Sequence, residues 1–282
     1  MTRGLAETLA TFLAAGIDVA RVVVADARGS TPREAGAAML VTADQTEGTI
    51  GGGRFEWDAI AVARELLASG GSHRTLEIPL GPAIGQCCGG HVTLTITRAD
   101  ARTLAAMTTS EATERARRPH ILIFGAGFVG RALASALAPL PFHVRLIDNR
   151  AAEFTGFDAP GIVQVVTDRT LTEVEAAPTD AAYLVMTHSH ALDALIAGAV
   201  LERGDFRYLG IIGSRTKRKR FEAAFRQQGI AARDIARITC PIGSPSVRDK
   251  RPAVIAALAA AELITIFAAD VTAQTDASRR VA

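Results

Sequence analysis

The pattern of apolar and polar positions changes character partway along the chain. Up to about residue 97, an N-terminal helix precedes short apolar strands that glycine-rich turns interrupt, and the segment 91–98 alternates apolar and polar residues like a half-buried strand. Beyond residue 119, apolar runs, glycine turns and helical segments alternate, which is typical of a parallel sheet covered on both faces. The sequence therefore predicts an α/β protein, with an N-terminal α+β domain followed by a Rossmann-like doubly wound parallel-sheet domain.

The predicted boundary between these domains lies in a polar segment. Residues 108–118 carry charges of both signs and precede Pro119, so we interpret them as a linker between domains at 1–107 and 119–282. The helix predicted from about Pro252 to Ala269 is apolar enough to be mostly buried, and a frayed tail is expected after it.

Composition narrows the class of protein. With 282 residues, 49% of them hydrophobic and 21% charged, the chain can form a real core. The three cysteines are an odd number and their only close pair is vicinal, so no disulfide framework is expected and a cytoplasmic location fits best. The N-terminal segment is broken by Glu7 and predicts a surface helix rather than a leader. No apolar stretch is long enough to cross a bilayer, and a net charge of +2 gives no drive toward nucleic acid or membrane.

The most informative motif is the run Gln86-Cys87-Cys88-Gly89-Gly90. A thiolate is both the nucleophilic and the soft-metal-binding form of cysteine, and glycine lets the backbone approach a ligand closely. The alternative is a pair of buried, inert thiols. We predict that the whole run contributes to a ligand site, with Cys87 and Cys88 as candidate metal ligands.

Two further features of the first half could bind an anion. Gly52 and Gly53 precede a helix that starts near Arg54, so their turn could hold a phosphate at the helix N-terminus or be a plain tight turn. Arg33 follows Ser30, Thr31 and Pro32 in a loop, where it could pair with a carboxylate or phosphate or belong to an ordinary turn.

The second half carries a dinucleotide fingerprint. Gly125, Gly127 and Gly130 follow an apolar strand and open a helix, and Asp148 ends the next strand about twenty residues later. This arrangement predicts a Rossmann-like domain. It leaves open whether the domain binds a nucleotide, because such folds host many functions.

Polar groups follow three more apolar runs of the second half, where strands of a parallel sheet would end. Because these ends share one edge of the sheet, we expect the groups to converge on a ligand. Ser189 and Ser214 are each also candidate N-caps. His188, His190 and Asp193 have a spacing that could ligate zinc, but no fourth ligand lies nearby, so contact with a ligand or with loop backbone is preferred. The candidate binding residues here are His188, His190, Ser214, Arg215 and Lys217, whereas Cys240 is interpreted as a packed thiol.

The segments that carry these residues, taken in order, resemble the XdhC/CoxI family. The resemblance rests on GSTPREAGAAML, GTIGGGRFEWDAI, LGPAIGQCCGG, ILIFGAGFVG, THSHALD, IGSRTKRKRF and CPIG. It covers nearly the whole chain, and QCCGG, THSH and IGSRTKR together are far more specific than the glycine fingerprint alone. Near its end the chain has SPSVRDKRP where the family has an IG-rich segment, which favours the branch that serves xanthine dehydrogenase.

The resemblance implies a chaperone of the molybdenum cofactor rather than an enzyme. Such a protein binds molybdopterin-bound molybdenum, protects it while a terminal oxo ligand is exchanged for sulfido, and inserts it into xanthine dehydrogenase, with a cysteine desulfurase as the sulfur source. In the family the cysteine of the QCCGG segment is implicated in cofactor binding, which points to Cys87 or Cys88 without deciding between them. Thiolates suit molybdenum, and helix N-termini with arginine or lysine suit the cofactor's phosphate.

Two other functions are compatible with the residues. The first is an NAD(P)-dependent oxidoreductase that uses the Rossmann-like domain, although neither Tyr183 nor Tyr208 is followed by a lysine four residues later. The second is a docking adaptor that binds a partner through the basic segment 215–220. A homodimer is compatible with a chaperone that hands over a buried cofactor.

Overall fold

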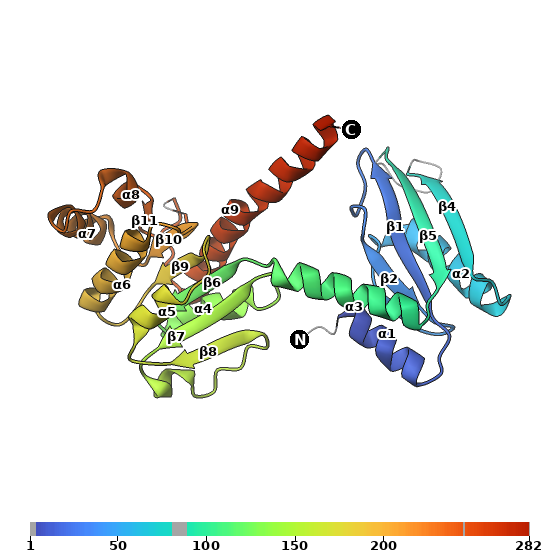
Figure 1. Cartoon of the computed structure of the whole chain (residues 1–282), viewed down its shortest axis with the longest axis horizontal. Helices are drawn as coiled ribbons and strands as arrows, with labels where there is room; N and C mark the ends of the chain where they lie inside the picture. The colour runs from blue at the N-terminus through green and yellow to red at the C-terminus, as the bar shows by residue number, and fades with distance from the viewer. Residues whose placement is uncertain (1–3, 81–88, 245, 282) are drawn as a thin grey trace. The chain divides into compact units, whose positions relative to one another are not determined.

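The structure is a computed structural model that describes residues 4–80, 89–244 and 246–281, with side chains described as far as Ala268 in the C-terminal helix (Figure 1). The chain divides into two compact units, Thr2–Ala116 and Arg117–Ala282. Gln86, Cys87 and Cys88 lie outside the described residues.

The first unit is a five-stranded antiparallel sheet with helices on both faces. Its strands run in the order β3-β2-β1-β5-β4. The elements in chain order are α1 (Leu5–Ala14), β1 (Ala20–Arg28), β2 (Ala38–Val41), β3 (Thr46–Gly48), α2 (Gly53–Ala68), β4 (His73–Pro79), β5 (His91–Arg98) and α3 (Ala101–Ala116).

Side-chain alternation in β2 shows how the helices are divided between the two faces. Met39 and Val41 pack with α2, whereas Leu40 points to the other face and packs with α1 and Met107 of α3. The Glu111 carboxylate accepts a hydrogen bond from the Ala6 amide at 2.8 Å, which ties α3 to the start of α1.

The second unit is a doubly wound parallel sheet. Its strands run in the order β11-β10-β9-β6-β7-β8, which is the order that defines the Rossmann fold and confirms the predicted fold class. The elements are β6 (His120–Phe124), α4 (Phe128–Leu137), β7 (His143–Asp148), the 3-10 helix η2 (Ala151–Phe154), β8 (Ile162–Val166), α5 (Thr170–Glu175), β9 (Ala182–Val185), α6 (His190–Arg203), β10 (Tyr208–Ile211), α7 (Arg215–Gln227), α8 (Ala232–Ala236), β11 (Ile238–Thr239) and α9 (Pro252–Val281).

Both faces of this sheet carry a core because successive strand residues point to opposite sides. Leu122 and Phe124 of β6 pack beneath α5, α6, α7 and α8, whereas Ile121 and Ile123 pack beneath α4 and α9. Fully buried apolar strands such as β9 and β10 are what a sheet covered on both faces requires.

Three local expectations differ from the structure. The segment expected to be a linker is helical as far as Ala116, since its alanine, glutamate and arginine residues favour helix and only the approach to Pro119 stops it. The C-terminal helix continues to Val281, so the frayed tail is wrong. This helix is also not mostly buried, because its described buried residues form a single stripe, Ala256, Ala259, Ala260 and Leu263.

Candidate functional site

In the first unit, both ends of the segment that carries the cysteine pair are held at one place. The Leu80 amide donates to the Gly90 carbonyl at 2.7 Å, and Gly89 forms a bridge with Ser30. A Cβ on Gly90 would lie 2.3 Å from the Ser30 carbonyl oxygen and 2.8 Å from that of Arg28. Only glycine fits there. The close backbone approach predicted for this glycine is therefore made to the Arg28 and Ser30 carbonyls of the same chain.

The arginine loop connects this place to the glycine turn that precedes α2. A Cβ on Gly51 would lie 2.5 Å from Pro32 Cβ and 3.4 Å from Arg33 Cγ, so the loop packs directly against the turn. The Arg33 side chain is exposed. The structure thus brings Arg33, the glycine turn and the Gly89–Gly90 end of the cysteine segment together on one unit.

A carboxylate of the chain itself already accepts hydrogen bonds from the glycine turn, and sequence reasoning missed it. α2 begins at Gly53 after Gly52, both with φ near +74°, and the Glu56 carboxylate accepts hydrogen bonds from the amides of Ile50 at 2.8 Å and Gly52 at 3.0 Å. Burial acts to raise the pKa of Glu56, but these bonds and one from the Thr49 hydroxyl outweigh it and lower that pKa. A ligand phosphate at this turn would have to displace the Glu56 carboxylate. The available signal was an acidic residue in the first turn of the helix.

In the second unit, the three fingerprint glycines have different roles. Gly125 has φ +115° and its Cβ would lie 2.3 Å from the Met186 carbonyl oxygen, and a Cβ on Gly130 would lie 1.8 Å from the Gly125 carbonyl oxygen. Gly127, at the N-terminus of α4, has an ordinary φ of −67°, and a Cβ there would meet no atom within 4 Å. Gly125 and Gly130 are therefore required by packing, whereas Gly127 leaves open space beside the helix N-terminus.

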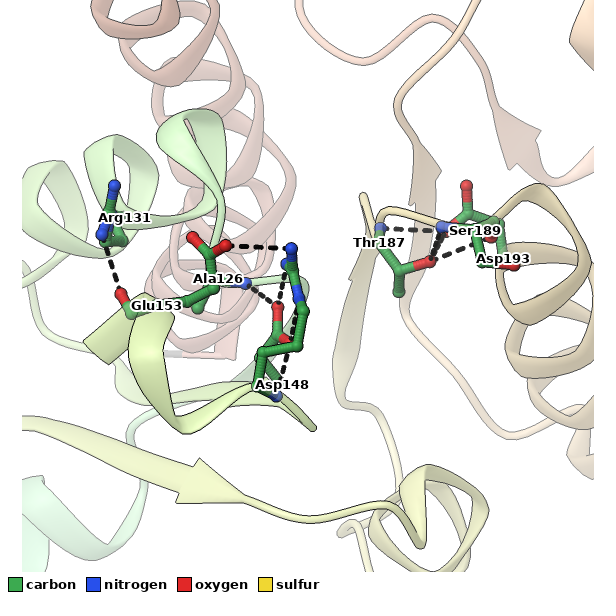
Figure 2. Close-up of polar contacts among 8 residues, drawn as sticks. Ala126, Arg131, Asp148, Glu153, Thr187, Ser189 and Asp193 are labelled. Atoms are coloured by element: carbon green, nitrogen blue, oxygen red, sulfur yellow. Dashed lines mark hydrogen bonds and ion pairs between the residues drawn. The ribbon is translucent and has the colours of Figure 1, made fainter. Parts of the chain in front are cut away.

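Asp148, the acidic residue of the predicted fingerprint, already accepts hydrogen bonds from its own chain (Figure 2). Its Oδ2 accepts from the Ala126 amide and from Arg150 Nη2, both at 2.8 Å, and its Oδ1 accepts from Arg150 Nε at 2.9 Å. Burial acts to raise the pKa of Asp148, but these hydrogen bonds outweigh it and hold that pKa below its usual range. Each nitrogen of the Arg150 guanidinium also has a partner, because its Nη1 pairs with Glu153 at 2.9 Å.

The cleft beside Asp148 is small. It lies between the ends of β6, β7 and β9, is lined by Gly125, Thr187 and His188 among others, and has a volume of about 10 Å³. That volume is room for about one water molecule. A dinucleotide ribose placed at Asp148 would therefore meet a carboxylate whose two oxygens already accept hydrogen bonds within the chain.

Lys217 is tied into the fold rather than turned toward a ligand. Its Nζ donates to Asp193 Oδ2 at 2.5 Å and to the Ile212 carbonyl at 2.9 Å, and the side chains of Lys217 and Asp193 are only 11% and 1% exposed. Asp193 Oδ1 accepts from the Thr187 amide at 2.9 Å and the Thr187 hydroxyl at 2.7 Å (Figure 2). Asp193 thus has three donors within the fold, so it does not join His188 and His190 in a zinc site.

The other predicted residues of this edge divide into capping and exposed groups. The Ser214 hydroxyl accepts from the Lys217 amide at 3.3 Å and Ser189 caps α6 in the same way, which confirms both as N-caps. His188, His190 and Arg215 are exposed. Within the described residues no group of three or more histidine, cysteine, aspartate or glutamate side chains could hold a metal ion.

Cys240 is a packed thiol, as predicted. It is 5% exposed, and burial raises its pKa although Lys217 and Arg218 act in the opposite direction. The thiol therefore stays protonated at neutral pH.

The fold and these sites define a two-unit protein whose second unit is a Rossmann domain in which the fingerprint aspartate is hydrogen-bonded within its own chain. Comparison with known families gives the same class: the chain matches the family described as XdhC Rossmann domain over residues 121–263 and the one described as XdhC and CoxI family over residues 12–79. The chain belongs to the XdhC/CoxI family, which confirms the resemblance seen in the sequence.

Two relatives extend this comparison. An Escherichia coli K12 protein, the uncharacterized protein YqeB, is 29% identical over 253 residues, which is 86% of this chain and 42% of the length of that relative. A crystal structure from Bacillus halodurans, described as a xanthine dehydrogenase, superposes with a TM-score of 0.78 at 18% identity and covers 95% of this chain and 96% of that one. That likeness establishes the shared fold. Among the helices that the structure describes, none has the length and apolarity needed to cross a membrane.

Proposed function

We propose that this chain is an accessory protein of xanthine dehydrogenase that binds the molybdenum cofactor as cargo. It holds the cofactor while a terminal oxo ligand is exchanged for sulfido, with sulfur supplied by a cysteine desulfurase, and then passes it to the enzyme. Membership of the XdhC/CoxI family supports the accessory role. The observation that carries the cargo site is the arginine loop of the first unit. This loop contacts the Gly89–Gly90 end of the cysteine segment at Ser30 and the glycine turn at Pro32 and Arg33, and its Arg33 side chain is exposed.

The residues of the first unit suit the two chemical ends of this cargo. Molybdenum held by dithiolene sulfur takes thiolate ligands, which Cys87 and Cys88 can supply. The phosphate end of the cargo is a match for the Arg33 guanidinium, which can donate two parallel hydrogen bonds. Because Glu56 already accepts from the Gly52 amide, we assign phosphate binding to the Arg33 side chain rather than to the turn.

The alternative function, an NAD(P)-dependent oxidoreductase, has no support from the geometry of the second unit. Both oxygens of Asp148 and all three nitrogens of the Arg150 guanidinium have partners within the chain. A tight NAD(H) complex would require these partners to separate.

The test is the molybdenum retained after the chain is incubated with freshly released cofactor and desalted. The wild-type chain should retain near-stoichiometric metal, and the Cys87→Ser, Cys88→Ser double variant should lose it. Cys240→Ser is the matched control, because it removes a packed thiol of the other unit and should leave retention unchanged. Equal retention by wild type and the double variant would rule out the cysteine pair, and no retention by either would favour the docking adaptor.

Two variants test the assignment of phosphate binding to the Arg33 side chain. Arg33→Gln should weaken cargo retention about tenfold or more, as expected for loss of a charged hydrogen-bond donor. Arg102→Gln removes an exposed arginine of the same unit in α3, on the face of the sheet opposite α2, so it should have no effect. Equal losses in both variants would show a general charge effect instead of a phosphate contact.

A further inference from the structure

A second, larger cavity in the second unit is separate from the cleft beside Asp148. It has a volume of about 510 Å³, which lies within the range of about 300–1,000 Å³ typical of small-molecule sites. It is lined by residues of the first two turns of α7, by Cys240 and Pro241 after β11, and by Glu262 of α9. The cavity thus joins the two sequence motifs, IGSRTKRKRF and CPIG, that the proposed cargo site does not use.

The cationic side chains that line this cavity lie on one face of α7. Arg215, Arg218 and Lys219 line the cavity together with Glu222, at the i, i+3, i+4 and i+7 spacing of a single helical face. Phe221 and Phe225 are on the other side of α7 and pack into the core. The basic run therefore lines a cavity with this face.

The carboxylates of the cavity wall are already engaged. Glu222 pairs with Arg218 at 2.8 Å and with Arg226 at 3.6 Å. Glu262 Oε2 accepts from the Tyr208 hydroxyl and from the Gly243 amide, each at 2.9 Å.

The cationic side chains of the cavity have fewer acidic partners than the carboxylates have donors. Arg215 and Lys219 have no ion pair within the part of the chain that the structure describes, and the neutral Cys240 thiol adds no negative charge. The cavity therefore has two cations without acidic partners and a third, Arg218, that shares its partner with Arg226.

We propose that this cavity binds the phosphate group of a small molecule, with Arg215, Arg218 and Lys219 as its cationic contacts. A phosphate has three acceptor oxygens and about two negative charges, which suits three donors spread over one helical face better than a single carboxylate would. The room left over in the cavity accommodates an organic group attached to that phosphate. This site does not depend on the proposed cargo function, because it lies on the second unit and involves none of the cysteine segment.

The test is calorimetric titration of the full chain with AMP and with pyrophosphate at low ionic strength, with adenosine and succinate as probes that lack phosphate. AMP and pyrophosphate should bind, and adenosine and succinate should not. The Arg215→Gln, Lys219→Gln double variant should weaken binding at least about tenfold. Arg220→Gln with Arg233→Gln removes the same charge from exposed positions outside the cavity, one of them on the same helix, and should leave affinity within about twofold.

A third variant gives a gain of binding that a misfolded protein could not produce. Glu222→Gln releases Arg218 from its carboxylate and removes one negative charge from the wall, so it should tighten AMP binding several-fold. Three results would overturn the proposal: no binding of either phosphate probe at about 1 mM, equal loss in the two double variants, or weaker binding after Glu222→Gln.

Discussion

Replacing Lys217 by methionine should strongly destabilise the second unit without removing cargo from the first. Methionine replaces the lysine stem without its ammonium group and can pack against the Phe221 ring, which lies 5.4 Å from Lys217 Nζ. The substitution leaves the Asp193 carboxylate, 1% exposed, with Thr187 as its remaining donor residue. Breaking a buried ion pair in this way costs about 3–5 kcal/mol. For a unit of this size each kcal/mol lowers Tm by about 2–4 °C, so Tm of the second unit should fall by about 6–20 °C.

The assay is thermal unfolding followed by circular dichroism and calorimetry, with two companion variants. Adding Asp193→Asn to Lys217→Met removes the unpaired charge and should recover part of the lost Tm. Arg251→Met breaks an ion pair of the same 2.5 Å length with Asp249 on the surface, where the arginine side chain is 78% exposed, and should leave Tm unchanged. If Lys217→Met changed Tm no more than Arg251→Met does, or if adding Asp193→Asn recovered nothing, the reasoning about this buried pair would be refuted.

Two further predictions concern the fingerprint and a histidine pair of the second unit. Gly130→Ala should lower the free energy of unfolding by about 3 kcal/mol, because its Cβ would lie 1.8 Å from the Gly125 carbonyl oxygen. Gly127→Ala should lower it by about 0.5 kcal/mol or less, because a Cβ there meets no atom within 4 Å. Similar losses for both variants in urea denaturation would contradict these roles. The pKa of His120 is lowered by burial and by the nearby His143 and Arg145, and its ring stacks on that of His143 at 4.7 Å. Because the unfolded chain then binds the proton more readily, stability should fall as the pH drops below about 6.5, and His120→Gln should reduce that fall; an unchanged pH profile in the variant would show that another group is responsible.

Sequence periodicity was sufficient for the fold because each pattern reports a local burial requirement. Continuous apolar runs such as β9 and β10 can exist only in a sheet covered on both faces, and the spacing from Gly125 to Asp148 reflects the strand, turn and helix of the Rossmann start. The polar segment before Pro119 was harder to interpret. Its composition suits both a linker and an exposed helix, and contacts such as that of Glu111 with Ala6 involve distant parts of the sequence.

The candidate sites show where sequence reasoning stops. It placed Asp148 at the end of a strand, and Ser214 and Lys217 where the next helix begins after a strand, as the fold requires. It could not show that Arg150 saturates Asp148 or that Lys217 turns inward to Asp193, because both depend on side-chain directions set by packing. The cavity under α7 was equally hidden, since the residues that follow β11 approach the helix only in three dimensions.

The most direct test of the proposed function is transfer of cargo to its acceptor. The chain would be loaded with the molybdenum cofactor, freed of excess cofactor, and mixed with xanthine dehydrogenase that lacks it, and the metal in each separated protein and the activity of the enzyme would be measured over time. We expect molybdenum to leave the chain and to appear in the enzyme together with activity, and the chain with Cys87→Ser and Cys88→Ser, treated in the same way, to deliver none. Metal that stays on the chain, or activation no faster than with the same amount of free cofactor, would show that the chain is not a carrier of this cargo.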